Sequence, residues 1–190
     1  MSPLLWLLVG PNGAGKTTYY HHKIQPRLRA PFVNADLLAQ DRWPDAPEKH
    51  AYEAAQQAES LRNRLLTQGR SFVAETVFSH PSKVDLIRAA KDRGYVVWMS
   101  FLYLESADLA VSRVACRVRE DGHAVPPDKI RSRYERLSAH IHAALPLVDT
   151  LFMIDNSRER AAFRTVAVYH QGQRSFLHPQ APSWTRAFPA

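Results

Sequence analysis

Gly10-Pro11-Asn12-Gly13-Ala14-Gly15-Lys16-Thr17 carries the strongest structural signal in this chain. The segment matches the pattern GxxxxGK[ST] at every fixed position, and it follows the apolar run 4–9, which is expected to be a buried strand. Glycines let backbone amides approach phosphate oxygens closely, and the start of a following helix adds the positive end of its dipole. The segment therefore predicts a P-loop that binds a nucleoside triphosphate.

The P-loop pattern also predicts which side chains meet the cofactors, ATP and Mg²⁺. Lys16 is expected to reach the β- and γ-phosphates, and the Thr17 hydroxyl is expected to bind Mg²⁺. The predicted nucleotide-binding residues are Gly10, Pro11, Asn12, Gly13, Ala14, Gly15, Lys16, Thr17 and Thr18.

Strands and helices alternate along the rest of the chain. Apolar runs predict strands at 32–34, 71–74, 95–104 and 151–154, and helices are expected at 15–24, 47–68, 81–93, 107–118 and around 130–141. A hairpin is expected around Gln171-Gly172. This order predicts an α/β P-loop NTPase or kinase fold with a mostly parallel sheet, helices on both faces and a C-terminal hairpin.

The length of 190 residues favours a single P-loop kinase domain, at residues 1–178, followed by an irregular, proline-rich tail at 179–190. A helical lid is expected within the domain at about 113–136. Arg113 and Arg117 are four residues apart on one predicted helix, and Arg133 follows the break after it. Arginines on both sides of such a break are typical of a lid that closes on a transferring phosphate, although a solvated basic face is the common alternative. His123, inside the break, is a candidate substrate contact.

Polar side chains follow the predicted strands at the edge where such sheets bind ligands. Asp36 could take a proton from an attacking hydroxyl, or it could cap a helix. Glu75 could hold Mg²⁺ through water or a substrate hydroxyl, to which Thr76 could donate. Asp155 follows four apolar residues, as a Walker B acid does, but its late position favours a turn or a base contact over magnesium binding.

The charge of the chain points to anionic partners. The 25 Lys and Arg residues exceed the 18 Asp and Glu residues, giving a net charge of +7. This excess fits a nucleic-acid surface or an enzyme site for a polyanionic small molecule. Cys116 is the single cysteine, so no internal disulfide can form, and no zinc-ligand spacing is present. No membrane span or signal peptide is expected, so the predicted compartment is the cytoplasm.

Several of these segments, taken in order, resemble the zeta toxin family of P-loop kinases. They are the P-loop, Asn34-Ala35-Asp36, Ala74-Glu75-Thr76, residues 113–118, residues 121–126, Arg133-Tyr134 and Asp155-Asn156-Ser157. The resemblance implies ATP- and Mg²⁺-dependent phosphorylation of the 3′-hydroxyl of UDP-N-acetylglucosamine and a small antitoxin that blocks the ATP site. It also implies Lys16 on phosphate, Asp36 as general base, and Glu75 and Thr76 near the substrate.

The lid is where this chain departs from the founding toxins, which are longer and have a different sequence there. The resemblance implies arginines that stabilise the transferring phosphoryl group, and Arg113, Arg117 and Arg133 are the candidates. The favoured function is an ATP-dependent kinase of a small acceptor, with a sugar nucleotide first. The alternatives are a kinase of a nucleic-acid end, a nucleoside or an antibiotic, and a nucleotide-dependent ATPase switch. A nucleic-acid partner is the less favoured, and no membrane partner is expected.

Overall fold

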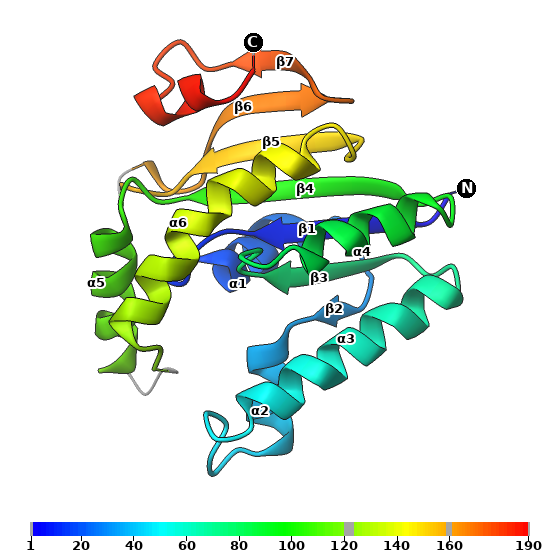
Figure 1. The fold of residues 1–190 in the computed structure, drawn as a ribbon, viewed down its shortest axis with the longest axis vertical. Coiled ribbons are helices and arrows are strands. Elements are labelled where there is room, and N and C mark those ends of the chain that lie inside the picture. Colours follow the sequence, from blue (N-terminus) through cyan, green and yellow to red (C-terminus); the bar gives the residue numbers. More distant parts are fainter. Residues whose placement is uncertain (1, 120–123, 159–160, 190) are drawn as a thin grey trace.

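A seven-stranded sheet with the order β2-β3-β1-β4-β5-β6-β7 forms the centre of the molecule (Figure 1). The computed structural model describes residues 2–119, 124–158 and 161–189. The strands from β2 to β5 pair in parallel, whereas β6 and β7 are antiparallel. The prediction of a mostly parallel sheet with a C-terminal hairpin is therefore confirmed. The strands are β1 Leu4–Val9, β2 Phe32–Val33, β3 Phe72–Thr76, β4 Val96–Tyr103, β5 Thr150–Asp155, β6 Arg164–His170 and β7 Gln173–Leu177.

Strand β1 lies in the middle of the sheet because its side chains are apolar on both faces. Leu5, Leu7 and Val9 belong to one hydrophobic cluster, and Leu8 belongs to another on the opposite face. The strand pairs with β3 on one side and β4 on the other. This central position fixes the P-loop, which begins directly after Val9, at the carboxyl edge of the sheet.

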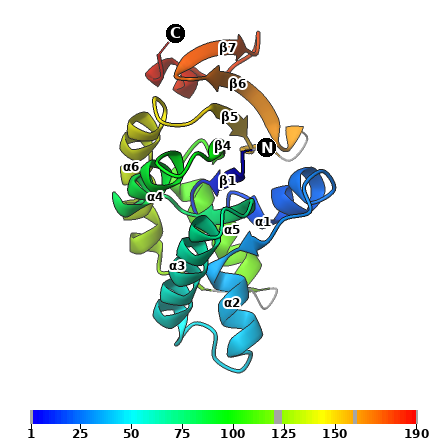
Figure 2. The same ribbon diagram turned by 90° about the vertical axis from the view of Figure 1, so that its right-hand side faces the viewer.

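Helices cover both faces of the sheet, as predicted. Helices α3, α4 and α6 pack on one face, and α1 lies on the other (Figures 1 and 2). The helices are α1 Lys16–Tyr19, which continues as the π-helical turn η1 Tyr20–Ile24, then α2 Ala35–Arg42, α3 Ala51–Thr67, α4 Ser82–Lys91, α5 Ala107–Val118, α6 Pro127–Ala144 and the 3₁₀ turn η3 Ser183–Ala187.

The segment before α3 differs from the sequence prediction. The helix begins at Ala51 instead of residue 47, and residues 47–50 form turns. The spacing of Asp45 and Glu48 matches a capping box, in which Glu48 would turn back to the amide of residue 45. In the structure the Glu48 carboxylate accepts a hydrogen bond of 2.8 Å from the backbone N–H of Ala124, within the predicted lid segment. This long-range contact replaces the local cap.

The sequence offered a helix at the position of α2 only as an alternative, with Asp36 as its cap. It begins because the Asn34 side chain caps it, accepting hydrogen bonds from the backbone N–H groups of Asp36 at 2.8 Å and Leu37 at 3.2 Å. Asp36 therefore lies in the first turn of α2 and is not its cap.

The C-terminal tail is more ordered than expected. It contains the turn η3, and its Phe188 side chain is only 6% exposed. Trp184 stacks on Tyr103 at the end of β4, with 4.0 Å between ring centroids. Apolar packing against the sheet thus orders a segment whose prolines prevent a longer helix. Within the described ranges, no helix combines the length and apolar character that crossing a bilayer requires.

Candidate functional site

The first residue of the P-loop, Gly10, has a backbone conformation that only glycine can adopt. Gly10 has φ of 150°, and a Cβ atom there would lie 2.3 Å from the carbonyl oxygen of Leu102 in β4. Farther along the loop, the Asn156 side chain donates a hydrogen bond of 2.9 Å to the carbonyl of Ala14 and accepts one of 3.2 Å from the N–H of Phe163. The P-loop is therefore fixed to the sheet at two points, by the close approach of Gly10 to β4 and by the hydrogen bond from Asn156 to Ala14.

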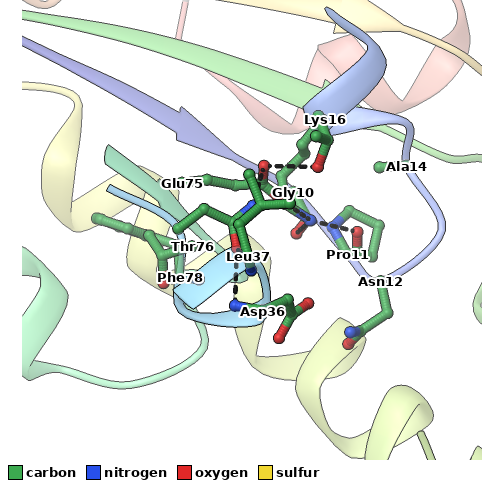
Figure 3. A network of polar contacts seen from close by, with 12 residues as sticks. Gly10, Pro11, Asn12, Ala14, Lys16, Asp36, Leu37, Glu75, Thr76 and Phe78 are labelled. Carbon is green, nitrogen blue, oxygen red and sulfur yellow. Dashed lines mark hydrogen bonds and ion pairs between the residues drawn. The ribbon is translucent and has the colours of Figure 1, made fainter. Parts of the chain in front are cut away.

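Lys16 lies on the floor of the site, where it is 7% exposed. Its ammonium group donates to the carbonyl oxygens of Gly10 at 3.1 Å and Pro11 at 3.0 Å and lies 3.8 Å from Glu75 Oε1 (Figure 3). Burial lowers the pKa of Lys16, and the nearby carboxylates of Glu75 and Asp36 oppose that change. The P-loop cation is thus surrounded by oxygen acceptors at the position where a P-loop lysine meets phosphates.

Glu75, at the end of β3, connects the P-loop to α2. Its Oε2 atom accepts hydrogen bonds from Thr17 Oγ1 at 2.9 Å and Asn34 Nδ2 at 2.8 Å. Burial raises the pKa of Glu75, while Lys16 and the Thr17 hydrogen bond oppose that rise. The Thr17 hydroxyl and this carboxylate are hard oxygen donors, which suit Mg²⁺ when phosphate oxygens and waters complete its octahedron. The described residues contain no group of three or more His, Cys, Asp or Glu side chains that could hold a metal alone.

Asp36 lies beside these groups with a free carboxylate (Figure 3). The side chain is exposed, and no other described residue forms a hydrogen bond or an ion pair with its carboxylate. Burial lowers the pKa of both Lys16 and Arg133, and the Asp36 carboxylate is close enough to oppose that lowering in each case. A free carboxylate near a phosphate-binding lysine is suited to accept a proton from a hydroxyl.

One cavity of about 800 Å³ joins these groups. The P-loop, Asp36 and the end of β3 form one wall, and Arg117 of α5 and Arg133 of α6 form another. Arg133 Nη1 also donates to Asn12 Oδ1 in the P-loop at 3.4 Å. The cavity therefore brings two of the three lid arginines to the phosphate-binding loop.

The other predicted site residues lie in different surroundings. Arg113 does not line the cavity, and its guanidinium points to the carbonyl of Ser157 at 3.5 Å. Thr18 is exposed in α1, away from the cavity. Thr76 lines the cavity, but its hydroxyl accepts a hydrogen bond of 3.2 Å from the N–H of Phe78, whose φ is 63°. His123 lies outside the described residues.

Asp155 belongs to a separate polar group at the end of β5. Its carboxylate accepts a hydrogen bond of 2.6 Å from the Ser157 hydroxyl and lies 3.3 Å from Arg164 Nη2. It lines a small cavity of about 180 Å³ next to the C-terminal tail and does not line the large cavity. The turn predicted from the sequence fits this geometry.

Sequence reasoning missed two cations that line the large cavity. They are Arg62 of α3 and Lys83 of α4. The sequence did hold a signal for Arg62, because the other buried residues of α3 are Ala54, Ala58, Leu65 and Leu66. Arginine is rarely buried without a partner, so an arginine on the apolar face of a helix indicates a binding or structural role.

Comparison with known proteins gives one family. A model of the family described as zeta toxin matches residues 1–180. A relative from Haemophilus influenzae, described as an uncharacterized protein, is 25% identical over 125 residues, which cover 66% of this chain and 88% of the relative.

Solved structures with the same fold include a protein of the PezAT chromosomal toxin-antitoxin system of Streptococcus pneumoniae, with a TM-score of 0.63 and 18% identity over 84% of this chain and 69% of that one. A second is the AvrRxo1-ORF1:-ORF2 complex with ATP, with a TM-score of 0.63 and 18% identity over 92% of this chain and 60% of that one. The chain thus spans less than two thirds of the second neighbour. The family model covers the P-loop, both cavity walls and the whole sheet, so the chain belongs to the zeta toxin family and has the fold of P-loop kinases.

Proposed function

We propose that this protein is an ATP-dependent phosphotransferase that moves the γ-phosphate to a hydroxyl group of a small acceptor. The observation that carries the proposal is the free carboxylate of Asp36 in the same cavity as Lys16, Arg117 and Arg133. Phosphoryl transfer needs positioning and neutralisation of charge more than covalent chemistry. The Asp36 carboxylate and these three cations line the same cavity and together would supply both requirements.

Each side chain has a proposed role in the transfer. Lys16 and the P-loop amides hold the β- and γ-phosphates, and Asp36 accepts the proton of the attacking hydroxyl. Arg117 and Arg133 stabilise the charge on the phosphoryl oxygens during transfer. Thr17 and Glu75 would hold Mg²⁺, which neutralises phosphate charge when bound. Arg113 is proposed to act indirectly, through the loop at Ser157 that it contacts.

The proposed acceptor is UDP-N-acetylglucosamine. Family membership supports this choice, and a cavity of about 800 Å³ lies within the range of pockets that enclose small ligands. Thr76 is proposed to lie near the acceptor, and His123 is proposed as a further contact. The acceptor identity follows from the family rather than from any single contact in the cavity.

The first test is a direct search for the product. Purified protein is incubated with ATP, Mg²⁺ and UDP-N-acetylglucosamine, and the mixture is examined by mass spectrometry. The proposal expects one added phosphate on the sugar nucleotide with the natural protein and none with Lys16→Ala. ADP without that product excludes this acceptor and leaves a kinase of another acceptor, with nucleic acid tested first, or an ATPase. If neither ADP nor the phosphorylated sugar nucleotide is formed, the proposed function is excluded.

We further propose a protein antitoxin as partner. The S. pneumoniae neighbour belongs to a toxin-antitoxin system, which supports the proposal for this chain. Expression of the natural protein in a bacterial host should slow growth, whereas Lys16→Ala should not. Equal growth with both proteins would argue against a toxic activity.

A further inference from the structure

Arg62 is a buried residue that forms no ion pair with any described residue. It is 7% exposed and lines the large cavity from α3, on the same stripe as Ala58 and Leu65. None of the described residues forms a hydrogen bond or an ion pair with its guanidinium. Its nitrogens are not among the fully enclosed side-chain atoms that lack a partner, so the guanidinium opens into the cavity. A buried arginine normally has several hydrogen-bond partners, because burial removes part of the water from its five N–H donors.

Lys83 stands next to Arg62 on the same wall. It lies in the first turn of α4, is partly buried, and also lines the cavity. Burial and the neighbouring guanidinium of Arg62 both lower the pKa of Lys83. Burial also lowers the pKa of Arg62. Glu59, exposed on α3, is the acid whose charge opposes the lowering of both pKa values, and it forms no ion pair with either cation.

This arrangement is unfavourable for the protein alone. Two like charges lie close together, each has lost part of its hydration, and Lys83 faces the positive end of the α4 dipole. Replacing buried charges with apolar side chains often leaves a protein as stable or makes it more stable. Two such cations on a cavity wall are explained when a ligand supplies the negative charge.

We infer that Arg62 and Lys83 form a second anion subsite, which binds a phosphate or pyrophosphate group of the acceptor in the cavity that the proposed catalytic arginines also line. The inference deepens the proposed function, on which it rests, because the subsite belongs to the acceptor part of the same cavity. The acceptor is then a compound with both a free hydroxyl and a phosphate group, and uncharged sugars are poor substrates.

A phosphate group fits this pair better than a carboxylate. Arginine offers a planar fork to two oxygens, and lysine adds a compact charge with three donors. A pyrophosphate presents enough oxygens to use both side chains at once. The positions of the two residues, on different helices, also fix the orientation of the acceptor relative to Asp36.

Binding of a probe to the subsite tests the inference without turnover. The protein is first saturated with Mg²⁺ and the non-hydrolysable ATP analogue AMPPNP, which fills the P-loop, and it is then titrated with inorganic pyrophosphate by calorimetry. We expect the natural protein to bind pyrophosphate and Arg62→Met/Lys83→Met to bind it about 10- to 100-fold more weakly. Equal binding by the two proteins overturns the inference, and so does tighter binding of malonate than of pyrophosphate.

A matched variant controls for net charge. Arg64→Met/Lys23→Met removes two positive charges from exposed positions that do not line the cavity. It should bind pyrophosphate like the natural protein, and a loss equal to that of the cavity variant would show only a general charge effect. The melting temperature separates binding from structure, since the cavity variant should melt at the same or a higher temperature. A fall would assign the two cations to folding instead.

Kinetics then separate this inference from the proposed function. With UDP-N-acetylglucosamine as acceptor, the cavity variant should have a KM for the acceptor raised about 10- to 100-fold and an unchanged KM for ATP. An unchanged KM for the acceptor keeps the proposed function and removes the subsite. Pyrophosphate binding through Arg62 and Lys83 without any sugar-nucleotide product keeps the subsite and removes the proposed acceptor.

Discussion

Asn34 connects two parts of the site through the two ends of one amide group. Its oxygen caps α2 and so places Asp36, while its nitrogen donates to Glu75 at 2.8 Å. Glu75 in turn accepts from Thr17 in α1. Three residues from separate segments thus set the distance between the phosphate-binding loop and the proposed base. The effect of a change at each of these positions follows from its own surroundings.

Asp36→Asn should lower kcat by about 10²–10⁴-fold, because the amide cannot accept the proton of the attacking hydroxyl. The KM for ATP and the melting temperature should change little, since the Asp36 side chain is exposed and forms no bond that supports α2. Asp41→Asn, an exposed position on the same helix outside the cavity, is the control. Steady-state kinetics with the natural rate in Asp36→Asn would remove the base assignment.

Gly10→Ala should destabilise the protein strongly. The new Cβ would lie 2.3 Å from the Leu102 carbonyl, so β1 and β4 must separate. Overpacking of this kind costs about 1–3 kcal/mol, and the strained backbone adds about 1–3 kcal/mol. Gly94→Ala is the matched control, because its φ is also positive, at 74°, but nothing lies within 4 Å of the added atom. Urea denaturation should show a clearly smaller loss for Gly94→Ala.

Glu75→Gln should remove a pH dependence of stability. Burial raises the pKa of Glu75 in the folded protein, so folding takes up a proton between the ordinary glutamate pKa and the raised value. The contribution of Glu75 to stability is therefore complete below pH 4.5 and is lost as the pH rises through the raised pKa. Denaturation of both proteins from pH 4.5 to 7 should show the natural protein losing stability relative to Glu75→Gln. A constant difference between the two contradicts the assignment.

At the scale of whole elements, the proposed lid consists of the end of α5, the start of α6 and the segment between them. The Tyr134 hydroxyl of α6 donates to the carbonyl of Leu104, at the end of β4, over 2.6 Å. One residue earlier, Arg133 reaches Asn12 in the P-loop. Between the two helices, the backbone N–H of Ala124 donates to the Glu48 carboxylate, in the turns that precede α3. The proposed lid is thus attached to the P-loop on one side and to the segment before α3 on the other.

Arg117→Ala and Arg133→Ala should each lower kcat by about 10²–10³-fold, as loss of one charge-stabilising donor does. Their KM values should change less, because the proposed interactions strengthen during transfer. Arg113→Ala should have a smaller effect, since its side chain contacts the Ser157 carbonyl and does not line the cavity. Rapid-quench measurement of the transfer step compares the three variants. If Arg113→Ala lowers the transfer rate as much as the other two variants, Arg113 has a direct catalytic role.

At the scale of the whole molecule, the C-terminal tail completes the core beside β4. Phe188 stacks on His142 of α6, with 4.2 Å between ring centroids, and the carbonyl of Ala187 lies 2.7 Å from His142 Nε2. The Tyr169 hydroxyl donates to the carbonyl of Pro189. The tail therefore joins the last helix to the antiparallel edge of the sheet.

Phe188→Ala should cost about 3–5 kcal/mol of folding stability, the usual loss for a buried phenylalanine in a core. Phe176→Ala, on β7, should cost much less because that side chain is 43% exposed. Thermal unfolding followed by circular dichroism compares the two variants. Similar melting temperatures would mean that the tail contributes little to the fold.

The sequence predicted the parts of this fold that depend on local pattern. The P-loop, the parallel strands and the hairpin each depend on short runs of apolar, glycine or turn residues. The start of α2 was missed because it depends on Asn34, which serves as a cap only when β2 delivers it beside Glu75. The position of Arg62 on the apolar face of α3 indicates burial, but the cavity that Arg62 and Lys83 line exists only in the folded chain. Contacts between distant segments, such as that of Asn34 with Glu75, cannot be predicted from local sequence patterns.

The central position of β1 has a consequence for synthesis on the ribosome. Leu4–Val9 leaves the ribosome before both of its partners, which are Phe72 to Thr76 on one side and Val96 to Phe101 on the other. The P-loop therefore has no sheet on either side until these later strands have been synthesised. Arg133, on α6, emerges later still. The phosphate-binding loop and the arginine that contacts it are thus brought together only after the chain has grown by 121 residues beyond Asn12.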